Sequence, residues 1–190
     1  MSSKLNGTGV TFNDATAQST ALNSINGKTP TTGAINGIIV SGTAVASTSG
    51  TSIDFASIPS WVKQITLMLN NVSTNGASKL LFQLGTSGGI QTTGYTGTGY
   101  TLGSSVGTST TGFKPDDAGS AADIRLGVYT FSLISSNSWI MSGCGTLTSA
   151  TYAILGAGSV TLSGVLTTLR VTTTGGTDTF DSGSINILYS

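Results

Sequence analysis

The segment that decides the fold spans residues 61–84 and reads WVKQITLMLNNVSTNGASKLLFQL. Its first half alternates apolar side chains with polar ones, a period of two that is typical of a half-buried β-strand. The apolar positions are Trp61, Ile65, Leu67 and Leu69. Asn75 and Gly76 readily adopt positive φ, and a second apolar run, 79–84, follows at once. We therefore predict an antiparallel hairpin over this segment.

The rest of the chain predicts an all-β protein with one core. Charged residues make up 7% of the 190 residues, against about 25% in ordinary globular chains. Low charge with abundant Thr, Val, Ile and Ser disfavours disorder. We predict strands over 35–46, 51–55, 61–72, 79–84, 95–102, 124–135, 138–144, 150–155, 165–173 and 184–189. Short strands separated by Gly, Ser and Asn turns predict an antiparallel β-sandwich of jelly-roll-like type.

The N-terminal region differs from the remainder in composition. Residues 1–22 carry few apolar side chains, and we predict an extended arm ordered by another chain or by the domain's own sheet. Residues 23–33 are rich in turn formers and are predicted to be a hinge before the domain at 34–190. The side chains expected to attach the arm are Leu5, Val10, Phe12 and Leu22.

Charge and cysteine content exclude several classes of protein. The formal net charge is zero and no window clusters Lys or Arg, so we expect no nucleic-acid binding. The single Cys144 excludes an internal disulfide. No apolar run has the length of a signal peptide core or a membrane span, so we expect a protein made in the cytoplasm without membrane insertion.

Several segments together resemble a known family. They are IDFASIPSWVKQIT at 53–66, VSTNG at 72–76 and the run ending in GGIQTTGY at 83–95. This order is similar to the C-terminal domains of bacteriophage tail-fibre and receptor-binding proteins. The flanks LNGTGVTFNDATAQSTA at 5–21 and GSINILY at 183–189 resemble segments common in phage fibre proteins. The resemblance covers about half of the chain, in pieces.

The resemblance implies a part of the virion tail, made in the host cytoplasm. It implies a homotrimer that attaches to another virion protein through the arm and binds bacterial surface polysaccharide for adsorption. The alternative is a purely structural virion component, a decoration or tail-tip scaffold with no receptor contact. A bacterial adhesin domain is a third reading, which the lack of a signal peptide and the lone cysteine oppose.

The run 124–134, IRLGVYTFSLI, is apolar on both faces. One face can fill the sandwich, and the other needs a cover because monomers rarely expose apolar patches beyond a few hundred Å². We predict that Tyr129, Phe131 and Leu133, or the side chains opposite them, form a subunit interface. The alternative is a central strand covered by a loop of the same chain.

A long Gly-, Thr- and Ser-rich stretch, 85–122, is the candidate binding loop, because loops of this length in compact domains are usually functional or disordered. Sugar binding needs an exposed aromatic plane beside polar donors and acceptors. The predicted carbohydrate-binding residues are Tyr95, Tyr100, Phe113, Asp116 and Asp117. Trp61 and Trp139 are alternative aromatic platforms, although a core position fits each of them better.

The chain offers little for catalysis. It contains no His, which removes the Ser-His-Asp and Cys-His mechanisms and most zinc sites. Two G-x-S-x-G matches, at 85–89 and 103–107, have no partner base. Paired carboxylates for glycoside hydrolysis, or for calcium, would have to come from Asp116 with Asp117 or Asp178 with Asp181, and turn residues fit these aspartates better. We expect no enzymatic activity, no cofactor and no metal.

Overall fold

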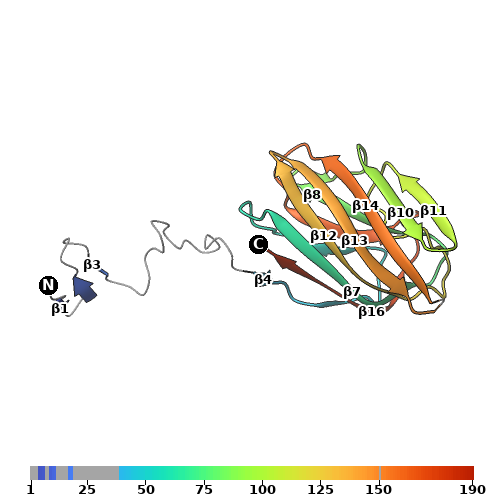
Figure 1. Ribbon diagram of the computed structural model, residues 1–190, viewed down its shortest axis with the longest axis horizontal. Helices are drawn as coiled ribbons and strands as arrows, with labels where there is room; N and C mark the ends of the chain where they lie inside the picture. Colours follow the sequence, from blue (N-terminus) through green and yellow to red (C-terminus); the bar gives the residue numbers. More distant parts are fainter. Residues whose placement is uncertain (1–3, 7–8, 12–16, 19–38, 150) are drawn as a thin grey trace. The chain divides into compact units, whose positions relative to one another are not determined.

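The computed structural model describes residues 4–6, 9–11, 17–18, 39–149 and 151–190 (Figure 1). The chain divides into two units, Met1–Ile38 and Ile39–Ser190. In the first unit, strands β1 (Lys4–Asn6), β2 (Gly9–Thr11) and β3 (Ala17–Gln18) form a small antiparallel sheet in the order β1-β2-β3. Leu5 lies opposite Val10 in this sheet. Phe12, Leu22 and the predicted hinge 23–33 lie outside the described residues, so arm attachment stays a prediction.

The second unit is all-β, as the sequence predicts, and its described strands pair antiparallel. Its large sheet contains nine strands in the order β11-β10-β14-β13-β12-β7-β16-β4, with β5 also paired to β16. These strands are β4 (Val40–Ser41), β5 (Val45–Ala46), β7 (Gln64–Thr74), β10 (Thr96–Thr101), β11 (Ser105–Ser109), β12 (Arg125–Ser135), β13 (Ser138–Leu147), β14 (Tyr152–Thr161) and β16 (Phe180–Tyr189).

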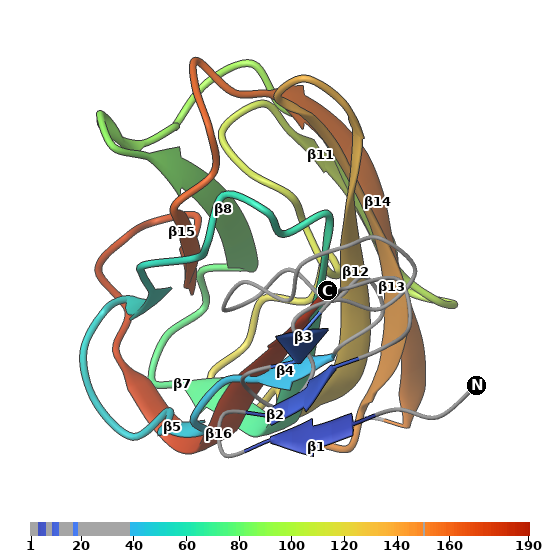
Figure 2. The same ribbon diagram turned by 90° about the vertical axis from the view of Figure 1, so that its left-hand side faces the viewer.

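The small sheet contains four strands in the order β6-β15-β8-β9. They are β6 (Ile53–Phe55), β8 (Leu80–Thr86), β9 (Gly89–Ile90) and β15 (Thr168–Thr173). Figure 2 shows β8 and β15 facing the curved sheet formed by β12, β13 and β14. The described residues include no helix of the length and apolar character needed to cross a membrane.

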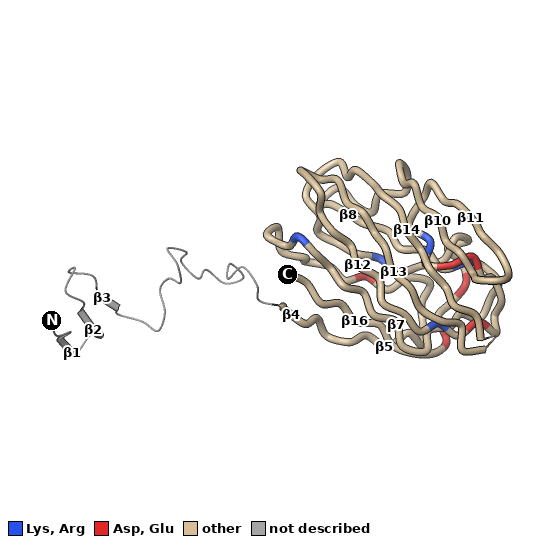
Figure 3. Tube along the Cα trace, viewed as in Figure 1, with Lys and Arg blue, Asp and Glu red and all other residues tan. Residues whose placement is uncertain are grey.

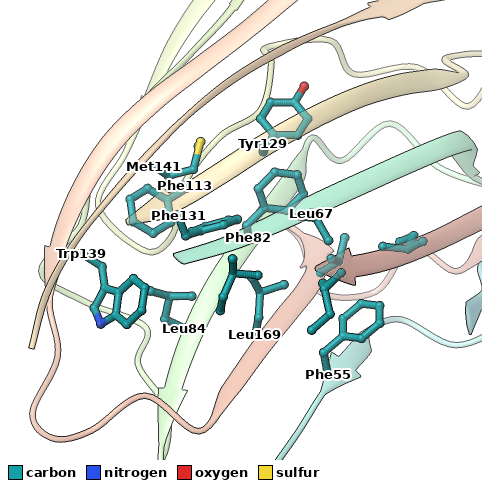
Figure 4. Packing of buried hydrophobic residues seen from close by; sticks show 14 of the residues in the cluster. Phe55, Leu67, Phe82, Leu84, Phe113, Tyr129, Phe131, Trp139, Met141 and Leu169 are labelled. Atoms are coloured by element: carbon teal, nitrogen blue, oxygen red, sulfur yellow. The ribbon is translucent and has the colours of Figure 1, made fainter. Parts of the chain in front are cut away.

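The core lies between the two sheets and is largely aromatic at its centre (Figure 4). The Phe82 ring on β8 lies 5.1 Å from the Tyr129 ring and 6.1 Å from the Phe131 ring, both on β12 and both edge-on. Phe113 packs on Phe131 at 5.5 Å. Edge-on pairs of this kind add to the free energy gained by burying the rings. The two sheets therefore form a sandwich around one core.

The predicted hairpin is wrong, although both of its strands are present. β7 pairs with β12 and β16 in the large sheet, whereas β8 pairs with β15 and β9 in the small sheet. The Asn75-Gly76 segment passes from one sheet to the other beside the β15–β16 connection. The amide of Asn75 donates to the Thr179 carbonyl at 2.9 Å, and the Ser78 amide donates to the Asp178 carboxylate at 2.7 Å.

The predicted alternation on β7 is confirmed, since Ile65, Leu67 and Leu69 are buried in the core. The predicted segment 35–46 contains only the short strands β4 and β5 among its described residues. Strands β9 and β11 were not predicted. β11 reads SVGTS, and so little apolar alternation gives no strand signal.

Candidate functional site

The predicted binding loop does not project from the domain. Its segment from Gly112 to Ala118 lies against the inner face of the large sheet. Glycines on that face make the approach possible: a Cβ built on Gly99 would collide with the Asp116 carbonyl, and one on Gly156 with the Lys114 carbonyl. Gly99 and Gly156 are direct neighbours across β10 and β14. The glycines of these strands thus leave room for the loop backbone to pack directly on the sheet.

The two aromatic rings expected to stack on sugar are buried. Phe113 has no exposed surface, and its backbone exchanges two hydrogen bonds with Phe82 at 2.8 and 2.9 Å. The Tyr95 ring meets the Phe113 ring edge-on at 5.1 Å, and its hydroxyl accepts a hydrogen bond from the Leu84 amide at 2.8 Å. Burial raises the pKa of Tyr95 to about 12. Both rings therefore belong to the core.

Asp116 forms a fully buried ion pair with Arg125. The guanidinium Nε donates to Oδ2 at 2.8 Å and one Nη to Oδ1 at 3.3 Å, while the Ala118 amide donates to Oδ1 at 2.8 Å. The same Nη donates to the Ala118 carbonyl at 3.0 Å. Burial first, and then the Asp116 charge, raise the pKa of the neighbouring Tyr129 hydroxyl. This pair fixes the loop to β12.

Asp117 belongs to a second, adjoining ion group. Lys114 donates to its carboxylate, and Lys79 lies 2.9 Å from the same oxygen. Burial alone would raise the pKa of Asp117, but hydrogen bonds from Lys114 and Lys79, together with their positive charges, hold it below its usual range. The Asp117 carboxylate is therefore paired within the protein.

Four of the five predicted sugar-binding residues are thus wrong as surface groups: Tyr95, Phe113, Asp116 and Asp117 are buried. Tyr100 is half-buried and faces the opposite side of the large sheet from them. Polar and small residues predict a surface loop here, whereas the segment is buried. The sequence signal for its burial is the alternate-position glycine in TGTGY (96–100) and GAGSV (156–160).

The predicted subunit interface is also wrong for Tyr129 and Phe131, which have no exposed surface, and Leu133 packs half-buried against the same core. The prediction that Trp139 fits a core position better than a binding platform is confirmed, because Trp139 is buried. Trp61 is half-buried, and its ring lies 5.9 Å from the Tyr189 ring. The side chains opposite Tyr129 and Phe131 on β12 remain exposed or half-buried.

Asp178 and Asp181 do not form a paired carboxylate site. Asp178 accepts from the Ser78 amide, whereas the Asp181 carboxylate accepts from the Ser73 hydroxyl. Within the described part of the chain, no group of three or more Asp, Glu, Cys or His side chains is placed to hold a metal ion.

The structure instead presents a polar groove of about 340 Å³ on the outer face of the small sheet. Its volume lies within the range of ligand sites, about 300–1,000 Å³. The groove is lined by Thr51, Ser52, Leu81, Gln83, Thr111, Arg170, Thr172, Thr173, Thr174, Gly175 and Gly176. We call this set the polar groove. Apart from Leu81, Gly175 and Gly176, each lining side chain carries a hydroxyl, an amide or a guanidinium.

The register of the small sheet places three polar side chains in one row beside this groove. Arg170 on β15 lies between Gln83 on β8 and Asp54 on β6. Its guanidinium donates two hydrogen bonds of 2.7 Å to the Asp54 carboxylate. This hydrogen bonding, more than the charge of Asp54, raises the pKa of Arg170 above its usual value. These bonds use two of the five N–H donors of an arginine. The Gln83 amide donates to the Thr111 carbonyl at 2.9 Å.

A smaller cavity of about 70 Å³ lies near the start of β7, beside Val62, Leu133, Trp139 and Leu166. Its volume is well below that of typical ligand sites, about 300 Å³ and above. The polar groove is therefore the better candidate site.

Sequence reasoning missed the groove because its residues come from four separated segments. The alternation in TLRVTT (168–173) does indicate that Arg170 and Thr172 share one face. Only strand pairing shows that Gln83 and Asp54 flank them. Comparisons of the chain with protein-family models, with curated proteins and with solved structures find no match.

Proposed function

We propose that this protein is a bacteriophage virion component, tail-fibre or baseplate-associated, whose polar groove binds polysaccharide on the host surface. The observation that carries the binding function is the row Gln83–Arg170–Asp54 beside a groove lined with hydroxyls. The virion assignment rests on the resemblance of residues 53–95 and of both flanks to phage fibre proteins.

The chemistry of the groove suits a neutral, hydroxyl-rich ligand. A sugar hydroxyl both donates and accepts hydrogen bonds. The groove offers a guanidinium and an amide as donors and Thr hydroxyls as both, and the Asp54 carboxylate beside it is an acceptor. Since the lining includes no aromatic ring, affinity per site rests on hydrogen bonds and is expected to be weak. Several copies on one particle would raise the avidity by orders of magnitude.

The proposal includes the topology of the domain and two features of the assembly. The domain has jelly-roll-like topology, the N-terminal arm attaches to another virion protein through Leu5, Val10, Phe12 and Leu22, and three copies associate. In such an assembly, the polar groove of each copy would face the host cell. The protein would be made in the host cytoplasm and assembled into the tail.

The test compares binding of labelled protein to susceptible cells and to isogenic cells without surface polysaccharide. We expect Arg170→Met to weaken binding by about tenfold or more, because hydrogen bonds to a charged group contribute about 1.5–3 kcal/mol. Lys63→Met is the matched control, since it removes one exposed positive charge outside the groove. Thermal unfolding of each variant confirms that folding is intact.

Equal binding to both cell types would overturn the proposal, as would Arg170→Met binding as tightly as Lys63→Met. In either case the second candidate function gains support, namely a structural virion component with no receptor contact. The observation that favours this alternative is the uncharged, partly apolar outer face of the large sheet, described next. A map of the particle discriminates, because a scaffold would bury the polar groove and an adhesin would leave it open.

A further inference from the structure

The outer face of the large sheet carries a continuous row of apolar side chains. Strand register places six residues side by side across six strands. In order they are Met68 on β7, Val128 on β12, Cys144 on β13, Leu155 on β14, Tyr100 on β10 and Val106 on β11. We call this set the apolar row. It runs perpendicular to the strands, so it arises from six separate segments of the chain.

Much of the row is open to solvent. Val128 is 50% exposed, Leu155 46% and Val106 61%, and the Cys144 thiol is also exposed. Half-buried Leu126 and exposed Leu102 extend the apolar area on one side of the row. On the other side lies a row of Thr, Ser and Ala side chains, which begins with Thr66 and Thr130.

Charge is missing from this face. Within residues 39–149 and 151–190, the six strands carry one charged side chain, Arg125, which points inward and is 1% exposed. Strands β13 and β14 are uncharged along their whole length, as the tube in Figure 3 shows. A partner that covers this face must itself be uncharged at the contact, because burying an unpaired charge is costly.

The size of the face matches that of a stable interface. The six strands are five to eleven residues long, so at about 4.8 Å between strands and about 3.3 Å per residue their face covers roughly 840 Å². A standard interface covers about 800 Å² on each partner. The apolar row and the flanking leucines occupy part of this face, and exposed apolar side chains gathered in this way on a soluble protein mark an interaction site.

We infer that this face binds a second copy of the same chain. A copy supplies an uncharged surface of equal area and the same apolar row, and the chain's formal net charge of zero creates no repulsion between copies. Closed symmetric association buries the face on each copy without leaving a free one. The inference rests on the part of the proposed function that has three copies associate, and it names the face on which they meet. It does not depend on polysaccharide binding, so a monomeric wild type that still binds susceptible cells would overturn the inference and leave the binding function standing.

The test measures the mass of the full chain by light scattering or sedimentation over a range of concentrations. Wild type is expected to form a closed oligomer. Val128→Lys places a charge in the middle of the face and is expected to raise the dissociation constant by about a hundredfold or more, because the charge is buried without a partner. Val165→Lys is the matched control, since Val165 is 54% exposed in a loop outside the six strands, and it should assemble as wild type does.

Alkylation of Cys144 gives an independent readout. In the assembled protein the thiol should react slowly, and in Val128→Lys it should react at the rate of an exposed thiol. Thermal unfolding of the monomeric variant shows whether its fold is intact. A monomeric wild type at all concentrations would overturn the inference, and so would a Val128→Lys protein that assembles normally. Binding of the face to a different virion protein by a monomeric wild type would also count against it.

Discussion

Two arginine–aspartate pairs occupy opposite situations in this protein. Arg125 and Asp116 are 1% and 0% exposed and lie between the sheets, whereas the side chains of Arg170 and Asp54 are 32% and 37% exposed on the outer face of the small sheet. Both pairs have two hydrogen bonds between guanidinium and carboxylate. The same chemistry therefore has two uses: the buried pair holds a loop in place, and the exposed pair remains accessible to a ligand.

The difference follows from what surrounds each pair. The buried pair is enclosed by the 112–118 segment, which the glycines of the inner face admit. Removing one partner there leaves a buried charge without its close counterion, which is far more costly than at a solvated site. The exposed pair can exchange its contacts for water at little cost.

The largest effect is expected for Asp116→Asn. The variant leaves buried Arg125 with only the longer contact to the Asp123 carboxylate, at 3.8 Å, and the free energy of unfolding should fall by an amount at the lower end of about 3–5 kcal/mol. Urea unfolding measures this loss. The double variant Asp116→Asn with Arg125→Met should recover part of it, because the unpaired charge is then gone. A loss below about 1 kcal/mol, the size expected of a surface pair, would remove the distinction between the two pairs.

Next in size is the loss for Gly156→Ala. Its Cβ would collide with the Lys114 carbonyl, so the loop that encloses the buried pair must shift. Overpacking of this kind costs about 1–3 kcal/mol. Gly88→Ala is the control, because its nearest neighbour is the Thr86 hydroxyl at 3.5 Å and it should change stability little. Equal stability of the two variants would show that the loop does not pack closely against Gly156.

A pH effect is expected at Asp117, whose pKa is held below its usual range in the folded protein. The stability it contributes is present above the unfolded pKa of about 3.9 and is lost as the pH falls through the lower folded pKa. Asp117→Asn should therefore flatten the fall in stability below about pH 4. Thermal unfolding between neutral and acidic pH tests this. A variant whose acid dependence parallels that of wild type would mean that the ion group with Lys79 and Lys114 is not stabilising.

The smallest effect on stability is expected for Asp54→Asn. Exposed ion pairs contribute about 0.2–1 kcal/mol, and salt screens them. Urea unfolding at low and high salt should show a loss of that size that shrinks as salt is added. A loss as large as that of Asp116→Asn would show that the row beside the polar groove is a structural element, which would weaken its assignment as a binding site.

Much of the fold was predictable because local alternation carries it. Ile65, Leu67 and Leu69 on β7 face the core as the period of two predicts, and the all-β class followed from composition and turn spacing. The hairpin prediction was wrong because an Asn-Gly pair indicates only that the chain turns. It does not report which strands pair on either side, and here β7 and β8 join different sheets.

The candidate site was the least predictable part. Asp116 and Asp117 occur in a Gly- and Ser-rich stretch that is typical of surface loops, and their burial depends on glycines in other strands, at Gly99, Gly107 and Gly156. The polar groove and the apolar row each combine segments far apart in the chain. No local pattern indicates such a combination.

By itself, the sequence determined the all-β class, the absence of histidine chemistry, the lack of an internal disulfide and most strand positions, because these depend on composition and on side chains one or two positions apart. The tertiary structure alone decided which strands neighbour one another, that the charged loop lies inside the sandwich, and that an uncharged apolar row and a polar groove lie on the two outer faces. The physical reason is that cross-strand register joins residues through backbone hydrogen bonds that carry no side-chain identity.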